Sequence, residues 1–208
     1  MEEDRKPKSA GRRRGPRKVT EKRLRNVALH YVARYAATTE SLRRVLMRRV
    51  LASARSHGTD ADEGAAWTEA LIIRFQELGY LDDRAFAETR ARALTARGLS
   101  LRAVRGRLRQ KGVSADDIEA ALEALTDEMA EPDLAAAAAL ARRRRLGPYR
   151  SDEVRPERRD KDLAALARAG FSYDIARRVI EADTVAELED MAAAETPAAG
   201  PRYVADDV

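Results

Sequence analysis

The stretch "RLRQKGVSADDIEAALEAL" at residues 107–125 decides the fold, because it contains a complete corner between two helices. A basic helical pattern ends at Gly112, and glycine commonly closes a helix in the left-handed conformation. Ser114 and Asp117 then form the S-x-x-D pattern that is typical of a helix N-terminus. Aliphatic residues at helical spacing predict the second helix, and they are Ile118, Leu122 and Leu125.

This corner resembles a DNA-reading helix-turn-helix, but its charges argue against that function. In such a motif the second helix enters the major groove of DNA. Here the second helix carries four carboxylates, and residues 112–125 contain no Lys or Arg. Phosphates would repel this helix, and it lacks the basic side chains that most often contact guanine. We therefore interpret the corner as a packing device and the basic helix before it as the contact surface.

The corner occurs twice in the chain. "GVSADDIEAAL" at 112–122 and "GFSYDIARRVI" at 170–180 share glycine, an apolar residue, serine, an acid, isoleucine and a late aliphatic residue. Other helical patterns surround both copies, and strand patterns are almost absent. The sequence predicts an all-α fold of three tandem three-helix repeats in an elongated, curved arrangement. A single irregular α-bundle with similar glycine turns is the alternative.

Composition suggests the boundaries of these repeats. Residues 1–18 carry eight Lys or Arg against three acids, which predicts a disordered basic tail over 1–19. Residues 184–208 carry six acids and one Arg, which predicts a disordered acidic tail. The repeats are expected at 20–80 (with a loop insertion near 53–64), 81–127 and 130–183. The core between repeats is expected to include Leu78, Tyr80, Leu81 and Phe86.

Several function classes find no support in the sequence. There is no cysteine, the two histidines are far apart, and no nucleophile elbow, phosphate loop or H-E-x-x-H motif occurs. We therefore expect no enzyme activity, no metal site and no cofactor. No apolar run is long enough to span a membrane and no secretory leader is visible, so we expect a cytoplasmic protein.

A strip of basic residues is the candidate functional surface. Residues 90–111 contain eight Lys or Arg and no acid, and a strip of one sign usually faces something negative. A solvated helix face is the alternative interpretation. Aromatic residues are rare in the basic stretches, so we do not expect a base-stacking platform. The candidate contact residues are Arg97, Arg102, Arg105, Arg107, Arg109 and Lys111, with Arg142, Arg143, Arg144 and Arg145 as outer candidates.

Several motifs together resemble the RecX family of bacterial RecA regulators. They are "ELGYLDDRAFAETRARAL", "RG" at 97–98, "VRGRLRQKGV" and "GFSYDIARRVI", and the resemblance covers roughly residues 21–183. It implies three three-helix repeats, in agreement with the periodicity. It also implies a protein, with no enzyme activity or cofactor, that binds the RecA filament on single-stranded DNA. Such proteins restrain the ATPase, strand-exchange and co-protease activities of RecA and thereby regulate DNA repair.

The sequence departs from the family pattern in the first repeat, where "RRVLASARSHGTDADEGAAW" replaces the expected glycine corner. We expect a monomer that meets RecA filaments, makes a weak direct contact with DNA and does not enter membranes. Two other functions remain open. The first is non-specific nucleic-acid binding through the basic tail and strip, which would be lost in high salt. The second is a scaffold for some other acidic protein.

Overall fold

The computed structural model describes residues 17–129 and 131–193, and this part of the chain contains ten α-helices, one 3-10 turn and no strand. The predicted all-α class is confirmed. The helices are α1 (Glu21–Val32), α2 (Thr39–His57), α3 (Ala61–Glu77), α4 (Asp83–Ala96), α5 (Leu101–Gln110), α6 (Ala115–Glu128), α7 (Pro132–Arg144), α8 (Arg155–Arg168), α9 (Tyr173–Glu181) and α10 (Val185–Ala193). The 3-10 turn η1 (Gly147–Tyr149) follows α7. No helix in the described ranges is long and apolar enough to cross a membrane.

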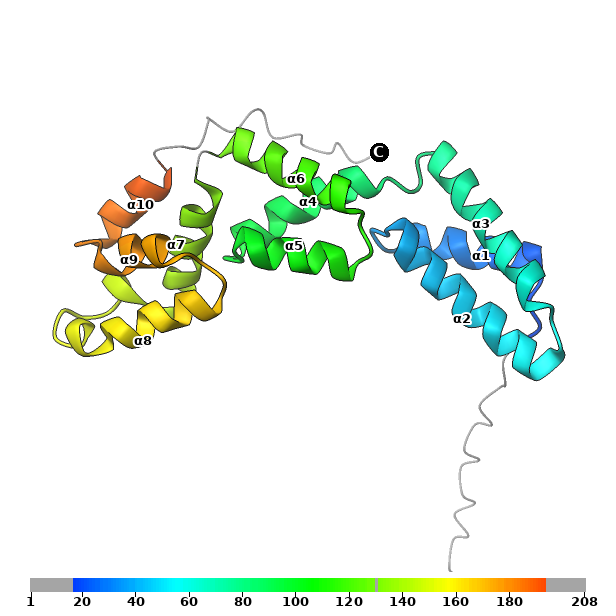
Figure 1. The fold of residues 1–208 in the computed structure, drawn as a ribbon, viewed down its shortest axis with the longest axis horizontal. Coiled ribbons are helices and arrows are strands. Elements are labelled where there is room, and N and C mark those ends of the chain that lie inside the picture. Colours follow the sequence, from blue (N-terminus) through cyan, green and yellow to red (C-terminus); the bar gives the residue numbers. More distant parts are fainter. Residues whose placement is uncertain (1–16, 130, 194–208) are drawn as a thin grey trace, which may run out of the picture.

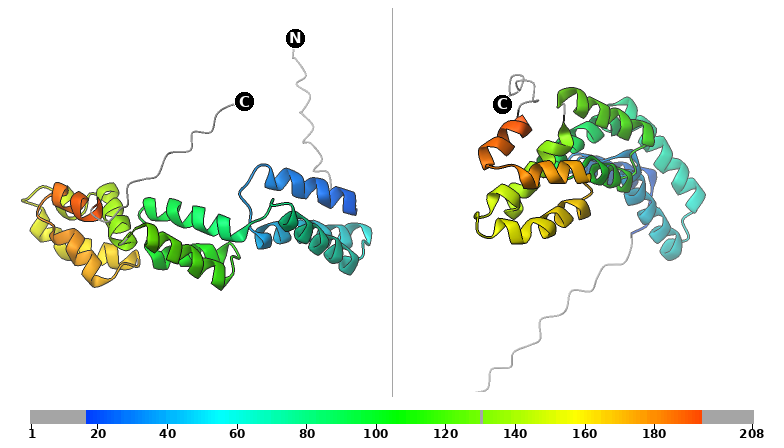
Figure 2. Two further views of the ribbon diagram at one scale, coloured as in Figure 1. Left: turned by 90° about the horizontal axis from the view of Figure 1, so that it is seen from above. Right: turned by 60° about the vertical axis from the view of Figure 1, so that its left-hand side comes forward.

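The helices form three bundles, each with its own hydrophobic core. Leu24, Leu42 and Leu46 are fully buried in the first bundle, which is built from α1, α2 and α3. A second cluster lies among α4, α5 and α6, and a third lies among α7 to α10. Figures 1 and 2 show the three bundles following one another along an elongated arch. This arrangement agrees with the predicted curved array of three helical repeats.

Both glycine corners adopt the predicted geometry. Gly112 ends α5 with φ +81°, and Gly170 ends α8 with φ +96°, so both lie in the region that side chains rarely adopt. The Ser114 hydroxyl accepts a hydrogen bond from the amide of Asp117 at 3.1 Å and caps α6. The equivalent Ser172 caps α9. Each corner therefore ends one helix and begins the next within three residues, which keeps the bundles small.

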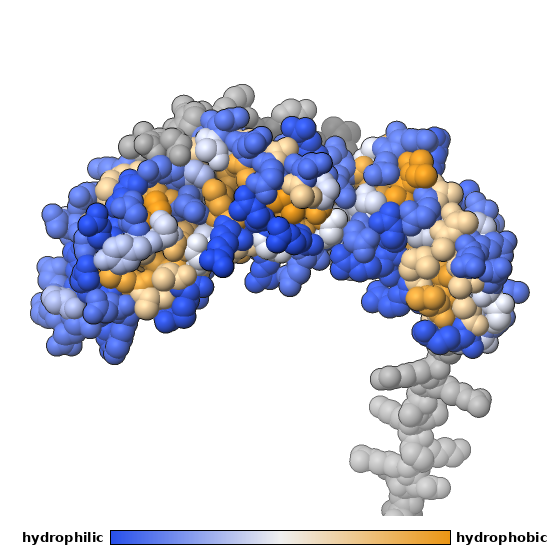
Figure 3. All heavy atoms as spheres, viewed as in Figure 1, coloured by the Kyte–Doolittle hydropathy of each residue, from blue (hydrophilic) through white to orange (hydrophobic). Residues whose placement is uncertain are grey.

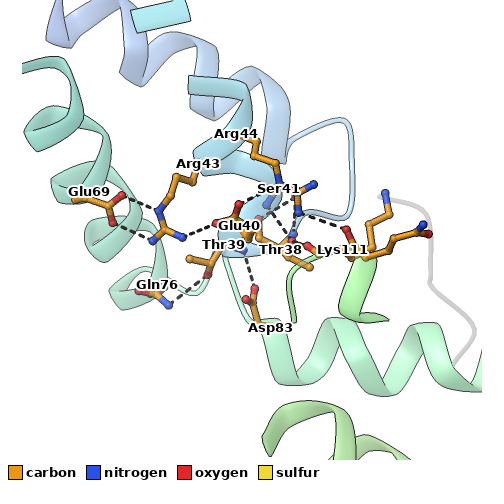
Figure 4. A network of polar contacts seen from close by, with 11 residues as sticks. Thr38, Thr39, Glu40, Ser41, Arg43, Arg44, Glu69, Gln76, Asp83 and Lys111 are labelled. Atoms are coloured by element: carbon orange, nitrogen blue, oxygen red, sulfur yellow. Dashed lines mark hydrogen bonds and ion pairs between the residues drawn. The ribbon is translucent and has the colours of Figure 1, made fainter. Parts of the chain in front are cut away.

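A pair of polar contacts, which we call the first clasp, joins the first and second bundles. The Thr38 hydroxyl, at the N-cap of α2, donates to the backbone carbonyl of Lys111 at 2.7 Å. The amide of Thr39 donates to the carboxylate of Asp83, in the first turn of α4, at 2.8 Å. Figure 4 shows these residues together with the neighbouring ion pairs of Arg43. The start of α2 is therefore held by both ends of the α4–α5 hairpin.

The second and third bundles are joined by an equivalent pair, the second clasp. The Ser100 hydroxyl, at the N-cap of α5, donates to the backbone carbonyl of Ala169 at 2.9 Å. The amide of Leu101 donates to the carboxylate of Asp133, in the first turn of α7, at 2.7 Å. This junction also contains direct packing of α4 against α7. No comparable helix packing joins the first two bundles within the described residues, so their junction depends more on its polar contacts.

Each junction contains a partly buried carboxylate and a corner glycine with little space around it. Burial raises the pKa of Asp83 and also that of Asp133, although in each case a hydrogen bond from a backbone amide opposes the shift. A Cβ at Gly170 would lie 2.7 Å from the Ser100 hydroxyl, and a Cβ at Gly112 would overlap with the Glu40 side chain. The corner glycines therefore allow the bundles to approach one another.

The expected loop insertion near 53–64 is wrong. Helix α2 continues to His57 because its buried stripe continues through Val50 and Ser53. The buried Ser53 hydroxyl accepts the amide of Val19 at 2.9 Å, so this polar residue belongs to the core. Gly58, with φ +65°, ends α2, and Asp60 caps α3, which begins at Ala61. The first bundle is therefore a regular three-helix unit without a long loop.

The expected disordered tail from residue 184 is also wrong over its first ten residues. Helix α10 occupies Val185–Ala193, and Leu188 is fully buried in the third core. The Thr184 hydroxyl accepts the amide of Glu187 and begins this helix. The third unit therefore extends beyond residue 183. The remaining predictions for the two tails lie outside the described residues, apart from residues 17–19, where Val19 is buried.

The prediction of core residues between repeats holds only in part. Leu81 is buried, at 4% exposure, and Phe86 is half-buried against the second core. In contrast Leu78 is 47% exposed and Tyr80 is 53% exposed. The reason is the turn at Gly79, with φ +72°, which directs only Leu81 of these residues into the first core. Two large apolar side chains therefore remain at the surface of the first junction.

Candidate functional site

Helix α5 carries the central part of the predicted basic strip. The Ser100 hydroxyl accepts the amide of Ala103 and caps the helix. Val104 and Leu108 are fully buried, so they fix one face of α5 against the second core. The opposite face is then exposed, because residues half a turn away on a helix point in the opposite direction. In Figure 1, α5 lies on the inner side of the arch, below α4 and α6.

The arginines of α5 differ in their partners. Arg105 forms two hydrogen bonds with the Glu119 carboxylate of α6, at 2.8 and 2.7 Å. This contact raises the pKa of Arg105 and lowers that of Glu119, and the charge of Arg109 lowers the latter further. Arg102, Arg107 and Arg109 are exposed and form no ion pair with a carboxylate in the described part of the chain. These three are the side chains of α5 that remain available to an anionic partner.

The ends of α5 lie at the two junctions between bundles. At the first junction, the exposed Lys111 gives its carbonyl to Thr38 and keeps its ammonium group without a described carboxylate partner. At the second junction, the stem of Arg102 lies near the corner glycine of the third bundle, Gly170. The basic strip therefore extends along the whole central bundle from one clasp to the other.

The outer candidates gather at the second junction. The Arg143 guanidinium donates to the backbone carbonyl of Arg97, so the end of α7 lies against the end of α4. Arg142, Arg144 and Arg145 are exposed, and Arg145 adopts φ +54° at the helix end. The structure therefore brings Arg97 together with the cluster from 142 to 145. Lys111 lies at the opposite end of α5, so the predicted residues form a strip rather than one pocket.

Sequence reasoning missed basic residues on the equivalent helices of the other bundles. Figure 1 shows α2 and α8 on the same inner side of the arch as α5. In Figure 3 hydrophilic side chains cover most of this inner edge. The repeat register of the sequence could have identified them, because α2, α5 and α8 are each the second helix of a unit. On α2 and α8, the exposed basic side chains without a described carboxylate partner include Arg48, Arg55, Lys161 and Arg168.

One acidic residue near this surface is structural. Asp162 of α8 is almost fully buried and accepts hydrogen bonds from Arg150 at 2.6 and 2.8 Å and from the amide of Gly147 at 3.1 Å. Although burial by itself would raise the pKa of Asp162, these hydrogen bonds lower it below its ordinary value. This carboxylate therefore fixes η1 to α8 and does not reduce the positive charge of the exposed strip.

The chemistry of the surface is electrostatic binding. No group of three or more His, Cys, Asp or Glu side chains in the described ranges is arranged to hold a metal ion. The exposed guanidinium groups are always charged, and each can donate several hydrogen bonds to phosphate or carboxylate oxygens. The arrangement therefore suits an extended anionic partner that contacts more than one bundle.

The chain is similar to several known proteins. A family model described as "RecX, second three-helix domain" matches residues 82–122. "Regulatory protein RecX" of Myxococcus xanthus is 46% identical over 179 residues, which cover 86% of this chain and 94% of the relative. The protein of the same name from Agrobacterium fabrum is 36% identical over 171 residues, covering 80% and 86% of the two chains. The crystal structure of RecX from Lactobacillus salivarius matches with a TM-score of 0.54 at 21% identity, covering 78% of this chain and 96% of that one, and it shows the shared fold.

Proposed function

The chain belongs to the RecX family of regulatory proteins, and from this premise we propose that it regulates RecA. It binds the RecA filament on single-stranded DNA and restrains the ATPase, strand-exchange and co-protease activities of RecA, mainly as an inhibitor. Through RecA it regulates DNA repair. It does so as a cytoplasmic monomer, without catalysis and without a cofactor.

The observation that carries this proposal is the row of unpaired cations along α5 between the two clasps. Arg102, Arg107, Arg109 and Lys111 are exposed without a described carboxylate partner. Helix α5 and its C-cap carry them, and this helix lies on the inner side of an elongated arch (Figure 1). An arch of this kind can follow the groove of a filament and contact neighbouring protomers and DNA phosphates together. By bridging protomers it hinders the motions and exchange that RecA activity requires. The cluster from Arg142 to Arg145 extends the contact toward the third bundle.

We propose the units of this array as 20–80, 81–127 and 130–193, the last extended by α10. Most of each hydrophobic cluster lies within one unit, although Val19 and Leu81 of the first cluster lie just outside 20–80. In tandem repeat proteins the stability of each unit depends on its own core and on its neighbours. Regulation by this protein therefore depends on the junctions that keep the three basic surfaces aligned.

The test is the ATPase activity of RecA on single-stranded DNA, measured while this protein is added well below the RecA concentration. We expect RecA activity to fall, because one bound arch affects several protomers. A second DNA-dependent ATPase at the same protein ratio is the control. Equal loss in both reactions would point instead to competition for DNA, which is the non-specific binding function.

A charge reversal tests the strip itself. Arg102→Glu with Arg109→Glu changes two exposed residues of α5 and keeps both residues of the Arg105–Glu119 contact. We expect the double variant to keep its helicity and to lose inhibition of RecA. The matched control reverses Lys22 and Arg25, two exposed residues of α1 without a described ion pair, and should inhibit normally. Normal inhibition by the Arg102 and Arg109 variant would contradict the assignment of the strip.

A further inference from the structure

A groove in the first bundle combines positive charge with aromatic rings. It lies between α1 and α2, has a volume of about 600 Å³ and contains no carboxylate among its lining residues. Its functional groups are the side chains of Arg17, Arg23, Arg49, His30, Tyr31 and Tyr35. These residues come from three separate segments, which are the chain before α1, α1 with the turn after it, and α2. The groove is therefore a product of the fold.

The arginines of this groove are not used in ion pairs. Elsewhere on α2, Arg43 is bound by the carboxylates of Glu40 and Glu69, and these contacts raise its pKa. Arg17, Arg23 and Arg49 have no carboxylate partner within the described ranges. Three guanidinium groups that converge on one hollow without counter-charge attract a polyanion, and their planar forks suit phosphate oxygens.

The aromatic residues form an exposed step beside these charges. The Tyr31 and Tyr35 rings lie 5.3 Å apart with a tilt of 47°, and Tyr35 is 53% exposed. The Tyr31 ring packs against the Tyr35 ring, and part of the Tyr35 ring remains exposed to solvent. Nucleic-acid bases stack on exposed aromatic side chains of this kind, and the stacking tolerates any base.

A second groove continues from the same tyrosine. It has a volume of about 560 Å³, lies at the first junction and is also lined by Tyr35, with Tyr80, Phe86, Arg90 and Lys111. Tyr80 is 53% exposed and contacts Phe75 edge to face at 5.4 Å. The carboxylate in this lining is Asp82, which accepts the amide of Ala85 as the cap of α4. The two grooves therefore share Tyr35, and both combine aromatic rings with cations.

We propose that these two grooves are a binding site for single-stranded nucleic acid. The phosphates lie on Arg17, Arg23 and Arg49 in the first groove and on Arg90 and Lys111 in the second. Bases stack on Tyr35 and Tyr80. A duplex keeps its bases stacked inside and cannot offer them to the tyrosines, so the site selects single strands. This proposal differs from the expectation of no stacking platform, because Arg49 of α2 and Tyr80 lie far from Tyr35 in the sequence and near it only in the fold.

The site is separate from the strip on α5 except at Lys111, where the second groove reaches the first clasp. Binding of a single strand here does not require RecA. A binding experiment with DNA alone therefore tests this site, and its failure would leave the proposed regulation of RecA untouched. Conversely, a chain that binds single strands without inhibiting RecA would contradict only the regulatory proposal.

The first measurement is fluorescence anisotropy of a short fluorescein-labelled oligothymidylate, titrated with the full chain at low salt. A duplex of the same length is the comparison and should bind more weakly. We expect Tyr35→Ala to weaken single-strand binding about tenfold, which corresponds to one lost stacking contact. Tyr35→Phe should restore the affinity, because the ring is retained. Tyr173→Ala is the matched control, since Tyr173 is 66% exposed on α9 and lies outside both grooves.

The second measurement is the dependence of affinity on salt, which counts phosphate contacts. For single strands each contact contributes about 0.7 to the slope of log affinity against log salt, so Arg23→Gln with Arg49→Gln should reduce the slope by about 1.4. Lys22→Gln with Arg25→Gln removes the same charge from exposed positions of α1 outside the grooves and should leave the slope nearly unchanged.

Two results would overturn the site. The first is an equal loss of slope in the groove pair and the control pair, which would mean diffuse attraction to a basic surface. The second is a duplex that binds as tightly as the single strand. If Tyr35→Ala fails to fold, as judged by circular dichroism, the salt dependence of the Arg23 and Arg49 variant tests the site instead. Arg49 is exposed and Arg23 is half-buried, and neither forms an ion pair in the described residues, so their substitution should not unfold the bundle.

Discussion

The sharpest test of the architecture is the substitution Thr38→Val at the first clasp. Valine keeps the shape of threonine and removes the hydroxyl, which is fully buried and donates to the Lys111 carbonyl at 2.7 Å. The same oxygen accepts the amide of Ser41 at 3.1 Å and caps α2. The substitution therefore removes one bond within the first bundle and one bond between bundles, without opening a cavity.

The expected cost follows from these two bonds. Loss of an N-cap costs about 1 kcal/mol. Loss of the hydrogen bond to the carbonyl costs about 1 kcal/mol or somewhat more, because the acceptor remains partly buried without its donor. The first bundle should lose about 2 kcal/mol in total. With a urea dependence of about 2 kcal/mol per molar, its unfolding midpoint should fall by about 1 M.

The chain contains a convenient probe for the first bundle. Trp67 is the only tryptophan in the sequence, and it packs against the first core. Its fluorescence in a urea titration reports the first bundle, whereas far-ultraviolet circular dichroism reports all helices. In Thr38→Val we expect the fluorescence transition to precede the circular dichroism transition. Thr38→Ser keeps both hydrogen bonds and should resemble the parent chain.

The second clasp supplies a matched comparison. Ser100→Ala removes the donor to the Ala169 carbonyl, but α4 still packs against α7 at that junction. The fluorescence of Trp67 should therefore keep its midpoint in this variant. If the two Thr38 variants unfold alike, or if the fluorescence and circular dichroism of Thr38→Val move together, the first clasp does not couple the bundles and the reasoning is refuted.

Three further substitutions test other parts of the structure. Leu188→Ala should destabilise the third bundle by about 2–5 kcal/mol in urea titrations, because Leu188 is fully buried; an unchanged midpoint would show that α10 does not dock. Burial raises the pKa of Asp133, so the stability gained from its protonated form is present at low pH and is lost as pH rises through the raised pKa. In Asp133→Asn the side chain still accepts the Leu101 amide but carries no charge, so this variant should melt at the parent temperature or above it at pH 7, with a smaller increase in melting temperature at pH 4. Asp133→Ala loses the acceptor and should lose about 1–3 kcal/mol of stability. Equal melting temperatures for the Asn and Ala variants would contradict the role of Asp133 as a hydrogen-bond acceptor. Gly106→Ala should raise the free energy of unfolding by about 0.5–1 kcal/mol and so raise the urea midpoint, since a Cβ there meets nothing within 4 Å; a loss of stability would show that this face of α5 has no room for a side chain.

Sequence reasoning predicted the repeated corners but missed the C-terminal part of α2 and the whole of α10. Gly112 and Gly170 occur in recognisable patterns, so both corners were predicted. The segment around Ser53 was expected to be a loop because its residues are polar and small. In the structure Ser53 is buried and hydrogen-bonded, which a composition argument cannot anticipate. Helix α10 was missed for a similar reason, since Leu188 lies among acids and its burial depends on α7.

The candidate site was also predicted only in part. The sequence located the cations of α5, but it could not assign their partners. Residues 90–111 contain no acid, yet Arg92 is paired with Glu128 and Arg105 with Glu119, both from α6. An ion pair between helices depends on which faces pack together, and that is a property of the bundle. The structure therefore reduces the available cations on α5 to Arg102, Arg107 and Arg109.

The sequence by itself determined the helical class, the repeated corners and the net positive charge, because each depends on local preferences or on composition. Only the tertiary structure decided which cations stay unpaired, how the clasps join the bundles, and where Tyr31 and Tyr35 meet Arg17 and Arg49. These outcomes join residues that are far apart in the chain. Their positions follow from the packing of buried side chains, which local sequence patterns do not specify.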